Sequence, residues 1–392
     1  MSSASIPTRS TPPPSDNAPT AAALTGLAAV FLRLGLTSFG GPAAHVALMR
    51  DEFVRRRRWI DDDAFIDLLG AANLIPGPTS TELAMHIGHR RAGKAGLVVA
   101  GLAFLLPAVV IVGILAWLYV EQGQRPVVGA LLAGVAPVVV AIVAHAGWSI
   151  GRTVVRTPFA AILLAATIGA ALAGVPEILV LLGAGGVAFA WGRWGGGAVA
   201  LVLASPGTAF ATGATLVVSA PAIFITFLKI GAVLFGSGYV LVALLRSELV
   251  DGLGWLTERQ LLDAVAVGQA TPGPLFSTAT FIGFLLAGPL GAAAATVGVF
   301  LPAFLAVGLS IPVLDRLRQS VAARSFLDGV NVGAVGLIAI VAVQLGFGAV
   351  RDLLSLMTGA LALALLVAGV GTGRLILAGA VIGLIRLALG SP

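Results

Sequence analysis

Long apolar stretches, separated by short polar segments, follow one another along almost the whole chain. A helix needs about 20 apolar residues to cross a bilayer, and most of these stretches approach or exceed that length. The pattern therefore predicts an all-α polytopic membrane protein, with a weaker apolar stretch at about 197–220. The main stretches are roughly 21–49, 64–87, 95–120, 127–150, 158–173 and 176–191, then 221–245, 260–286, 290–313, 328–349, 353–370 and 373–389.

The second set of stretches repeats the first. The segment "FLRLGLTSFGGPAAHVALMRDEFVRRRRW" at 31–59 aligns with "FLKIGAVLFGSGYVLVALLRSELVDGLGW" at 227–255, with each match 196 residues apart. Arg, Glu, Trp and a Pro-Gly-Pro tripeptide keep this register, and chance similarity between apolar helices does not explain such residues. After one deletion, "FLLPA" at 104–108 matches "VFLPA" at 299–303. The chain is therefore predicted to contain two homologous halves.

These halves define the predicted domain organisation. Residues 1–20 are polar and rich in Pro, Ser and Thr, which is typical of a disordered tail. Residues 21–195 form the first predicted repeat and residues 221–392 the second. Residues 196–220 form a connecting segment that is itself apolar enough to span.

Basic residues in matching loops indicate how the halves are oriented. Loops 50–63 and 88–94 are rich in Arg and Lys, whereas their counterparts at 246–259 and 287–289 are not; the next pair of loops, 121–126 and 314–327, reverses this bias. Because basic loops favour the cytoplasmic side, opposite bias at matching positions predicts an inverted repeat. A repeat with both halves facing the same way would place the bias on one side.

The same loops suggest that residues 64–87 do not cross the membrane. Loops 50–63 and 88–94 are both basic, so both are expected on one side. The segment between them would then enter the bilayer and return, with its turn at Pro76-Gly77-Pro78. The alternative is one kinked spanning helix with a misplaced basic loop.

The Pro-Gly-Pro tripeptides predict broken helices in both halves. Proline ends a helix and also restricts the residue before it. Irregular backbone at membrane depth is tolerated where protein or a water-filled cavity satisfies it. The helix that follows starts with unpaired N–H groups, which attract anions, and hydroxyls follow in "TSTE" at 79–82 and "LFSTAT" at 275–280. Paired broken helices therefore predict a midplane binding site. The alternative is a pair of hinges or packing kinks.

Further matched positions extend this prediction. "FGGP" at 39–42 and "FGSG" at 235–238 offer flexible backbone within apolar segments. Arg33 and Lys229 match as cations just before these breaks, and two cations would suit a dianion, although both could instead reach the membrane surface. Asn73 and Gln269 match as amide donors.

Three ionisable residues near the first half's broken segments have no ionisable counterpart. His45, Glu82 and His86 are replaced in the second half by Leu241, Thr278 and Ile282. A carboxylate inside a membrane is a functional candidate by default, so Glu82 is the predicted proton-coupling residue, together with His45. The alternative for Glu82 is an acid favoured by the helix dipole, and packing is the simpler role for the histidines.

Composition narrows the function classes. The chain is 58% hydrophobic and 10% charged, carries a formal charge of +6, and contains no cysteine and four histidines. The basic excess fits juxtamembrane loops, so no nucleic acid partner is expected. Without cysteine, an HExxH pattern or an acidic cluster within a span, we expect no metal, no cofactor and no enzymatic activity.

The motifs resemble those of the chromate ion transporter family in its long, two-half form. The resemblance rests on "FGGPAAHVALMRDEFVRRRRWI" and "LIPGPTSTELAMHIGHRRAGKAGLVVAGLAFLLPA" in the first half. In the second half it rests on "FGSGYVLVALLRSELVDGLGWLT" and "ATPGPLFSTATFIGFLLAGPLGA". It implies a secondary transporter that moves chromate across the bacterial inner membrane, usually by proton-driven efflux that gives chromate resistance, with sulfate as competitor.

Alternatives of other kinds stay open at this point. The chain could take up sulfate or another oxyanion, or conduct anions passively, and the sequence leaves the oligomeric state open, a homodimer included. The predicted substrate site comprises Arg33, Gly40, Gly41, Asn73, Pro76, Gly77, Pro78, Thr79, Ser80, Thr81, Lys229, Gly236, Ser237, Gly238, Gln269, Pro272, Gly273, Pro274, Ser277 and Thr278, with Glu82 and His45 as proton-coupling candidates.

Overall fold

The computed structural model describes residues 20–123, 125–194, 217–234, 238–313 and 320–390. In these residues the chain forms α-helices and short π- or 3₁₀-helical extensions, with no strand. The prediction of an all-α protein is confirmed. The predicted tail at 1–20 (Thr20 excepted) and most of the predicted connecting segment at 196–220 lie outside the described residues, as do Gly236 and Ser237.

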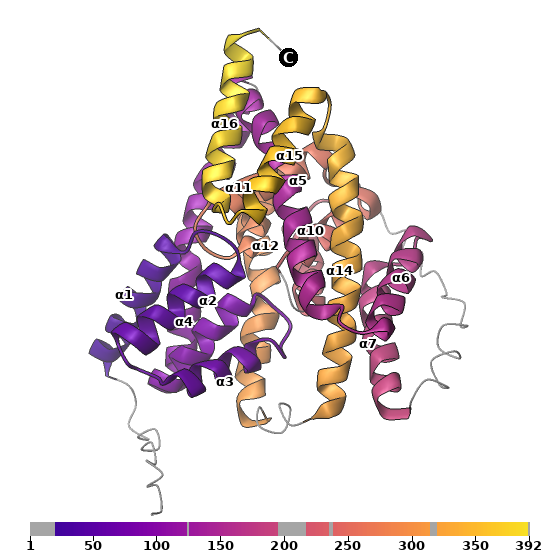
Figure 1. The fold of residues 1–392 in the computed structure, drawn as a ribbon. Helices are drawn as coiled ribbons and strands as arrows, with labels where there is room; N and C mark the ends of the chain where they lie inside the picture. The colour runs from indigo at the N-terminus through magenta and orange to yellow at the C-terminus, as the bar shows by residue number, and fades with distance from the viewer. Residues whose placement is uncertain (1–19, 124, 195–216, 235–237, 314–319, 391–392) are drawn as a thin grey trace, which may run out of the picture.

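The two halves contain the same series of α-helices with one π-helix each, and the second half adds two short 3₁₀-helices, η3 and η4 (Figure 1). The first half consists of α1 (Ala21–Thr37), α2 (Pro42–Arg50), η1 (Asp51–Arg56), α3 (Asp62–Ala72), α4 (Thr79–Gln122), α5 (Pro126–Val154), α6 (Pro158–Leu172) and α7 (Glu177–Trp194). The second consists of α9 (Ala220–Val233), α10 (Val240–Leu245), η2 (Arg246–Gly252), α11 (Glu258–Ala270), η3 (Leu275–Ser277), α12 (Thr278–Ser310), η4 (Ile311–Val313), α14 (Val321–Ala349), α15 (Leu353–Val367) and α16 (Thr372–Ala388).

Local sequence explains where these helices begin. Proline occupies the first turn of α2, α5 and α6, where its missing N–H is not needed. Asp61 caps α3 by accepting a hydrogen bond from the backbone N–H of Ala64, and Thr257 caps α11 in a capping box with Gln260. The matched helices α3 and α11 therefore start by the same device.

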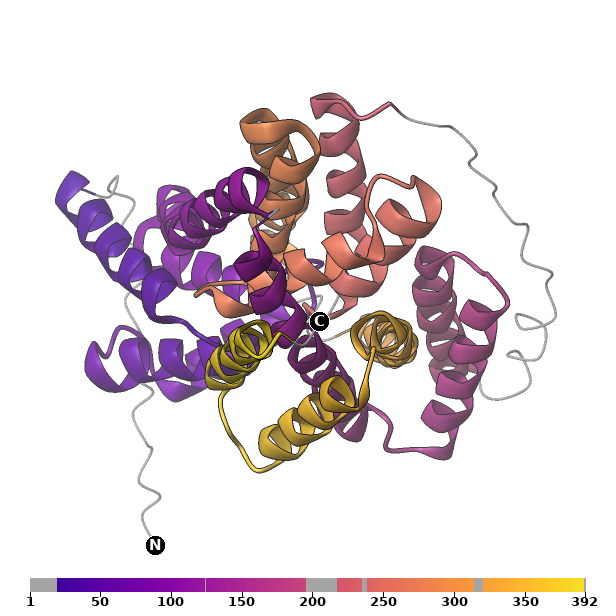
Figure 2. The ribbon, with the colours of Figure 1, turned by 90° about the horizontal axis from the view of Figure 1, so that it is seen from above.

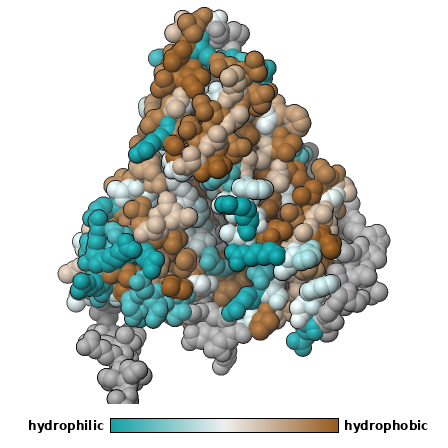
Figure 3. Space-filling view, viewed as in Figure 1, coloured by the Kyte–Doolittle hydropathy of each residue, from teal (hydrophilic) through white to brown (hydrophobic). Residues whose placement is uncertain are grey.

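Within the described ranges, four helices are long and apolar enough to cross a membrane: Thr79–Gln122, Pro126–Val154, Leu275–Ser310 and Val321–Ala349. The outer face of α4 shows what surrounds them. Leu102, Leu106, Val110 and Ile114 follow one another at helical spacing, and each is about half exposed. Such a stripe is unfavourable in water and suits lipid, and Figure 3 shows apolar side chains over much of the surface. The protein is a polytopic membrane protein.

The long helices α4 and α12 each contain a sharp turn near their start. Ala92-Gly93 and Ala287-Gly288 leave the helical conformation, and both glycines have positive φ. The chain folds back there so tightly that the helix before the turn touches the helix after it at glycine. A side chain at Gly88 would overlap the carbonyl of Gly96.

This turn bears on the predicted re-entrant segment. The arms before and after Pro76-Gly77-Pro78 are α3 and residues 79–91, about 17 and 20 Å long at 1.5 Å per residue. Neither reaches across the roughly 30 Å of a bilayer's hydrocarbon core, and α3 packs beside α4. The structure favours a broken, re-entrant segment over one kinked span.

The halves are interlocked rather than side by side. The last helix of each half packs on the other half: α16 lies along α5, and α7 lies along α14. The same exchange holds for α15 on α5 and α6 on α14. Viewed from above, α5 and α14 lie near the centre of the molecule, with α1–α3 and the α6–α7 pair on opposite sides (Figure 2). The two repeats therefore share one core.

The matched helices α5 and α14 run in opposite directions. In Figure 1, α5 descends from the α4–α5 turn near the top, whereas α14 rises from near the lower end of α12. The hydrophilic patch at the lower left of Figure 3 covers the region of α2 and α3. The exposed residues of this region include Arg55–Arg58, which follow α2, and Asp61–Asp63, where α3 begins.

Candidate functional site

The backbone breaks in the two halves meet at the interface between them. The Gly77 N–H donates a hydrogen bond to the Leu234 carbonyl oxygen at 2.7 Å. The Gly273 N–H donates to the Ser38 carbonyl oxygen at 2.8 Å. Ser38 and Leu234 are repeat counterparts, so the two bonds are equivalent. Each Pro-Gly-Pro turn is thus fixed to the break after the first helix of the other half.

Both Pro-Gly-Pro turns require glycine. Gly77 and Gly273 have φ values of +140° and +102°, which side chains disfavour. A Cβ on Gly77 would lie 2.7 Å from the Ala303 Cβ, and one on Gly273 would lie 2.6 Å from the Ala108 Cβ. Ala108 and Ala303 are again repeat counterparts, so the close contact between backbone and opposite half is built twice.

A small cavity of about 20 Å³ lies between these breaks. Helices that begin at Pro42, Thr79, Val240 and Leu275 all start at or beside its lining, two from each half. A cavity of this size holds about one water molecule, so the structure shows the site in a closed form. Its lining residues are Gly40, Gly41, Pro42, His45, Pro78, Thr79, Ser80, Gly238, Tyr239, Gly268, Gln269, Thr271, Gly273, Pro274, Leu275 and Phe276.

The electrostatic character of the cavity comes from backbone rather than from charged side chains. The first N–H groups of a helix have no partner within the helix and carry partial positive charge. Helix starts from both halves converge here, and none of the described lining residues is Lys, Arg, Asp or Glu. Such an arrangement can bind an anion without a permanent ion pair.

The polar side chains in the cavity come mostly from unmatched positions. His45 Nδ1 lies 3.2 Å from Ser80 Oγ, and the ring is 1% exposed. The Tyr239 hydroxyl and the Gln269 side chain interact across the second half. These groups could orient an oxyanion that the helix starts attract.

Glu82 lies just behind the cavity, in the first turn of α4. Its side chain is fully buried, and neither carboxylate oxygen has a hydrogen-bond partner among the described residues. A Cβ on Gly77 would lie 2.5 Å from Glu82 Oε1, so the carboxyl group directly adjoins the Pro-Gly-Pro turn. Burying an unpaired charge is costly, which makes this group a candidate for binding a proton.

The structure places Arg33 and Lys229 outside the described cavity lining. Arg33 Nη2 lies 2.5 Å from Glu52 Oε1, and Lys229 Nζ lies 2.6 Å from Glu248 Oε1. Both basic side chains are about half exposed. Because Glu52 and Glu248 are also repeat counterparts, these are matched ion pairs, and they satisfy the cations that were expected to face a dianion.

The other predicted residues divide into two groups. The first group lines the cavity: Gly40, Gly41, His45, Pro78, Thr79, Ser80, Gly238, Gln269, Gly273 and Pro274. The second group lies on the same breaks or next to them without lining it: Asn73, Pro76, Gly77, Thr81, Glu82, Pro272, Ser277 and Thr278. The hydroxyls of Thr81, Ser277 and Thr278 are buried without a hydrogen-bond partner among the described residues.

The sequence did not point to Tyr239, one of two aromatic residues in the described lining of the cavity. A signal was available, because the chain has only two tyrosines. An added Cβ at Gly41 would lie 3.2 Å from the Tyr239 hydroxyl, so this side chain reaches across to the first half's break. Its repeat counterpart is Ala43, so the repeat gives Tyr239 no matched polar residue.

Comparison with known proteins gives a family. A family model described as "Chromate transporter" matches residues 25–191 and again residues 221–384. The "Chromate transport protein" of Pseudomonas aeruginosa is 34% identical over 358 residues, which cover 86% of this chain and 85% of that protein. The "Probable chromate transport protein" of Synechococcus elongatus is 33% identical over 351 residues, covering 87% and 89%.

A third relative, the "Chromate transport protein" of Cupriavidus metallidurans, is 33% identical over 356 residues and covers 87% of this chain and 88% of itself. No solved structure matches the chain significantly. The family model covers each half separately, in agreement with the duplicated breaks and the duplicated hydrogen bonds described above. The chain belongs to the chromate transporter family.

Proposed function

We propose that this protein is a secondary transporter that carries chromate out of the cell across the bacterial inner membrane, driven by inward movement of protons. The relatives named as chromate transport proteins support the substrate. The observation that carries the proposal is the convergence of helix starts from both halves on one cavity whose described lining contains no charged Lys, Arg, Asp or Glu.

The cavity chemistry suits a tetrahedral dianion. Backbone N–H groups at helix starts donate hydrogen bonds to oxyanion oxygens from several directions. Ser80, Thr79 and Gln269 add donors that can turn toward the same oxygens. Sulfate has the same charge and shape as chromate, so sulfate is expected to compete for the site.

Transport requires the closed cavity to open in turn to the two sides. We propose that the halves form an inverted repeat, supported by the opposite directions of α5 and α14 and by the opposite basic bias of matching loops. The Gly77–Leu234 and Gly273–Ser38 hydrogen bonds would then be related by the repeat axis and lie toward opposite sides of the membrane. Loosening one while keeping the other would open the cavity toward one side at a time.

Glu82 is the proposed coupling residue, with His45 on the cavity wall as its companion. Glu82 is buried with no hydrogen-bond partner among the described residues, it adjoins the Gly77 turn, and its counterpart Thr278 cannot titrate. Adding or removing its proton changes the charge beside a dianion site by one unit. Proton binding at this position can therefore be linked to oxyanion release.

The proposal is tested by chromate flux into everted membrane vesicles, with and without a protonophore and with excess sulfate. Uptake that collapses with the protonophore and is reduced by sulfate supports proton-driven efflux. Glu82→Gln should then remove the protonophore sensitivity, whereas Thr278→Val, its matched control in the second half, should retain it. Flux confined to right-side-out vesicles would instead favour oxyanion uptake.

A passive anion channel is the outcome to exclude. A channel needs no coupling group, so Glu82→Gln would leave the flux intact and the protonophore would act only through the membrane potential. Chromate flux that follows an imposed potential equally in the parent protein and in Glu82→Gln would contradict the proposed coupling.

A further inference from the structure

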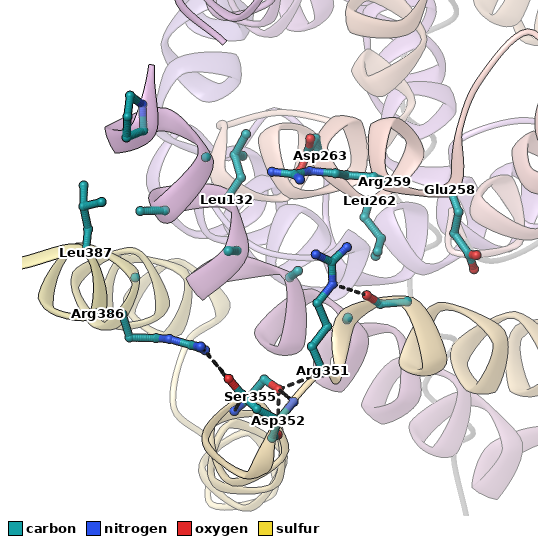
Figure 4. Close-up of a pocket in the computed structure, with 18 residues that line it drawn as sticks. Leu132, Glu258, Arg259, Leu262, Asp263, Arg351, Asp352, Ser355, Arg386 and Leu387 are labelled. Carbon is teal, nitrogen blue, oxygen red and sulfur yellow. Dashed lines mark hydrogen bonds and ion pairs between the residues drawn. The ribbon is translucent and has the colours of Figure 1, made fainter. Parts of the chain in front are cut away.

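A second and larger cavity lies away from the central site, at the other end of α11. Its volume is about 460 Å³, and it is bounded by the start of α5, the start of α11, the α14–α15 connection and the end of α16 (Figure 4). Asp263 lines this cavity and Gln269 lines the central one. The two residues are six positions apart on one helix, a rise of about 9 Å. We refer to the larger cavity as the vestibule.

Three arginines and three acids line the vestibule, and most of the acids are already matched. Asp352 caps α15 and pairs with Arg386. Glu258 Oε1 lies 3.7 Å from Nε of Arg246, which is outside the vestibule lining and also pairs with Asp251 at 2.6 Å. Asp263 accepts a hydrogen bond from the Tyr119 hydroxyl at 2.9 Å.

The other two arginines of the vestibule, Arg259 and Arg351, are not held by any carboxylate of the described residues. Neither forms an ion pair within 4.0 Å of a carboxylate in the part of the chain that the structure describes. Arg351 Nε makes a long 3.4 Å hydrogen bond to the Gly348 carbonyl oxygen, and Arg259 lies against Gly129 of α5. In Figure 4 Arg259 extends toward Asp263, and Arg351 points from the α14–α15 connection toward α11.

We infer that Arg259 and Arg351 form a second binding site for a tetrahedral oxyanion, separate from the central cavity. Guanidinium groups offer paired N–H donors whose spacing matches two oxygens of such an anion. The three acids of the lining balance its three arginines in formal charge, so the site rests on hydrogen-bond donors rather than on excess charge. Asp263 already accepts a hydrogen bond from Tyr119, which leaves most guanidinium N–H groups of Arg259 and Arg351 available to an anion. The oxyanion is either the free transported dianion or the phosphate of a lipid headgroup.

The first half has no equivalent of the arginine pair that lines the vestibule. The first-half counterparts of Glu258, Arg259 and Asp263 are Asp62, Asp63 and Asp67, so an acid replaces the arginine. The counterpart of Arg351 is Arg156, which is exposed. The equivalent end of α3 therefore lacks an arginine pair. An oxyanion would be collected at one end of the path and not at the other, which extends the proposed function beyond the central site.

A labelling experiment tests the vestibule without requiring transport. The chain has no cysteine, so Ala133→Cys places a single thiol on an exposed position of the vestibule wall. The rate of reaction with N-ethylmaleimide is measured on purified full-length protein in neutral detergent, in chloride and in sulfate at equal ionic strength. At sulfate concentrations ten times its dissociation constant, labelling should slow about tenfold, because about nine-tenths of the sites are occupied.

The variants decide whether the arginines are responsible. Arg259→Gln and Arg351→Gln, each in the Ala133→Cys background, should abolish the protection, whereas Arg156→Gln, the matched control, should retain it. Arg259→Lys, which keeps the charge, should retain part of it, and monodisperse elution of every variant shows that the fold survives. Equal protection in all variants, or none in the parent, would overturn the proposal.

One further measurement distinguishes a free dianion from lipid phosphate as the bound anion. Another distinguishes the vestibule site from the proposed transport function. Protection by sulfate in phosphatidylcholine vesicles assigns the vestibule to the free dianion, whereas protection by added phosphatidylglycerol, with no further effect of sulfate, assigns it to lipid phosphate. Ser80→Ala, in the central cavity, should weaken chromate flux and leave the vestibule protection unchanged. Normal flux together with absent protection would refute the vestibule alone, and normal protection without any chromate flux would refute the proposed function alone.

Discussion

The two halves share their backbone geometry and differ in the side chains placed on it. Both have a Pro-Gly-Pro turn, a hydrogen bond from its glycine to the other half, and a helix start at the cavity. The first half adds His45 and Glu82, and the second adds Tyr239 and the arginine pair of the vestibule. We infer that features present twice hold the anion, whereas features present once give the transport cycle its coupling and its direction.

Substitution of the glycine in either Pro-Gly-Pro turn should cause the largest loss of chromate flux, and the loss should be similar in the two halves. Gly77→Ala and Gly273→Ala each force a side chain into a positive-φ position against an alanine of the other half. Strain of this kind costs about 1–3 kcal/mol before the clash is counted. Both variants should lose at least roughly tenfold in chromate flux, since 1.4 kcal/mol corresponds to a factor of ten.

The control is Gly113→Ala, in α4, where an added Cβ meets no atom within 4 Å and φ is ordinary. This variant should keep both its flux and its thermal stability. Full activity of Gly273→Ala beside an inactive Gly77→Ala would show that the two turns are not equivalent.

The next largest difference in chromate flux is expected between substitutions of the matched amides, Gln269 and Asn73. Gln269 lines the cavity, is 8% exposed and interacts with Tyr239, whereas Asn73 does not line it. Gln269→Ala leaves the Tyr239 hydroxyl buried without that partner, at a cost of about 1–3 kcal/mol. We expect Gln269→Ala to lower chromate flux several-fold and Asn73→Ala to change it by less than about twofold. Equal losses would place Asn73 in the site as well.

Substitutions in the two matched ion pairs should give smaller differences, in thermal stability. Glu52 also has Arg57 Nε at 2.5 Å, so Arg33→Gln leaves it one close partner, whereas Glu248 has only Lys229 among the ion pairs of the described residues. Lys229→Gln should therefore lower the thermal midpoint more than Arg33→Gln does. Because both cations are half exposed, each loss should stay below about 1 kcal/mol. If either variant lost most of its chromate flux while Arg57→Gln kept it, Arg33 or Lys229 would instead act directly in substrate transport.

The smallest expected effect is a pH dependence in the first half. Burial alone would raise the pKa of Glu52, but its hydrogen bond to Arg57 and the charge of Arg33 hold that pKa below its usual value of 4.5. A carboxyl group with a lowered pKa stabilises the fold above the unfolded pKa and loses this contribution as pH falls through the folded pKa. The difference in thermal midpoint between the parent and Glu52→Gln should be constant near neutral pH and shrink below about pH 4.5. A difference that grows on acidification would contradict the ion pairs.

The sequence predicted the repeated elements well because the repeat marks them twice. Pro-Gly-Pro at 76–78 and 272–274 breaks a helix for local reasons, so its effect can be read without tertiary information. The helix starts that follow, at Thr79 and at Leu275, were predicted on the same grounds. The cavity therefore contains much of the set expected from the motifs.

The remaining features depend on contacts between distant segments. Arg33 was expected to face a substrate because no sequence rule shows that Glu52 folds back to within 2.5 Å of it. Gly77 bonds to Leu234 rather than to its own half, which depends on how the halves dock. The vestibule unites residues from α5, α11, α14, α15 and α16, and no local pattern connects them.

The interlocked halves have a consequence for the order in which the protein is made. The groove on α5 is filled by α16, where Gly134 meets Gly379 and Gly383 so closely that none could carry a side chain. During synthesis α5 precedes α16 by more than 200 residues. The surface of α5 that α16 covers therefore stays exposed in the membrane until α16 has been synthesised. A chain truncated before α16 would leave this surface of the first half unpacked.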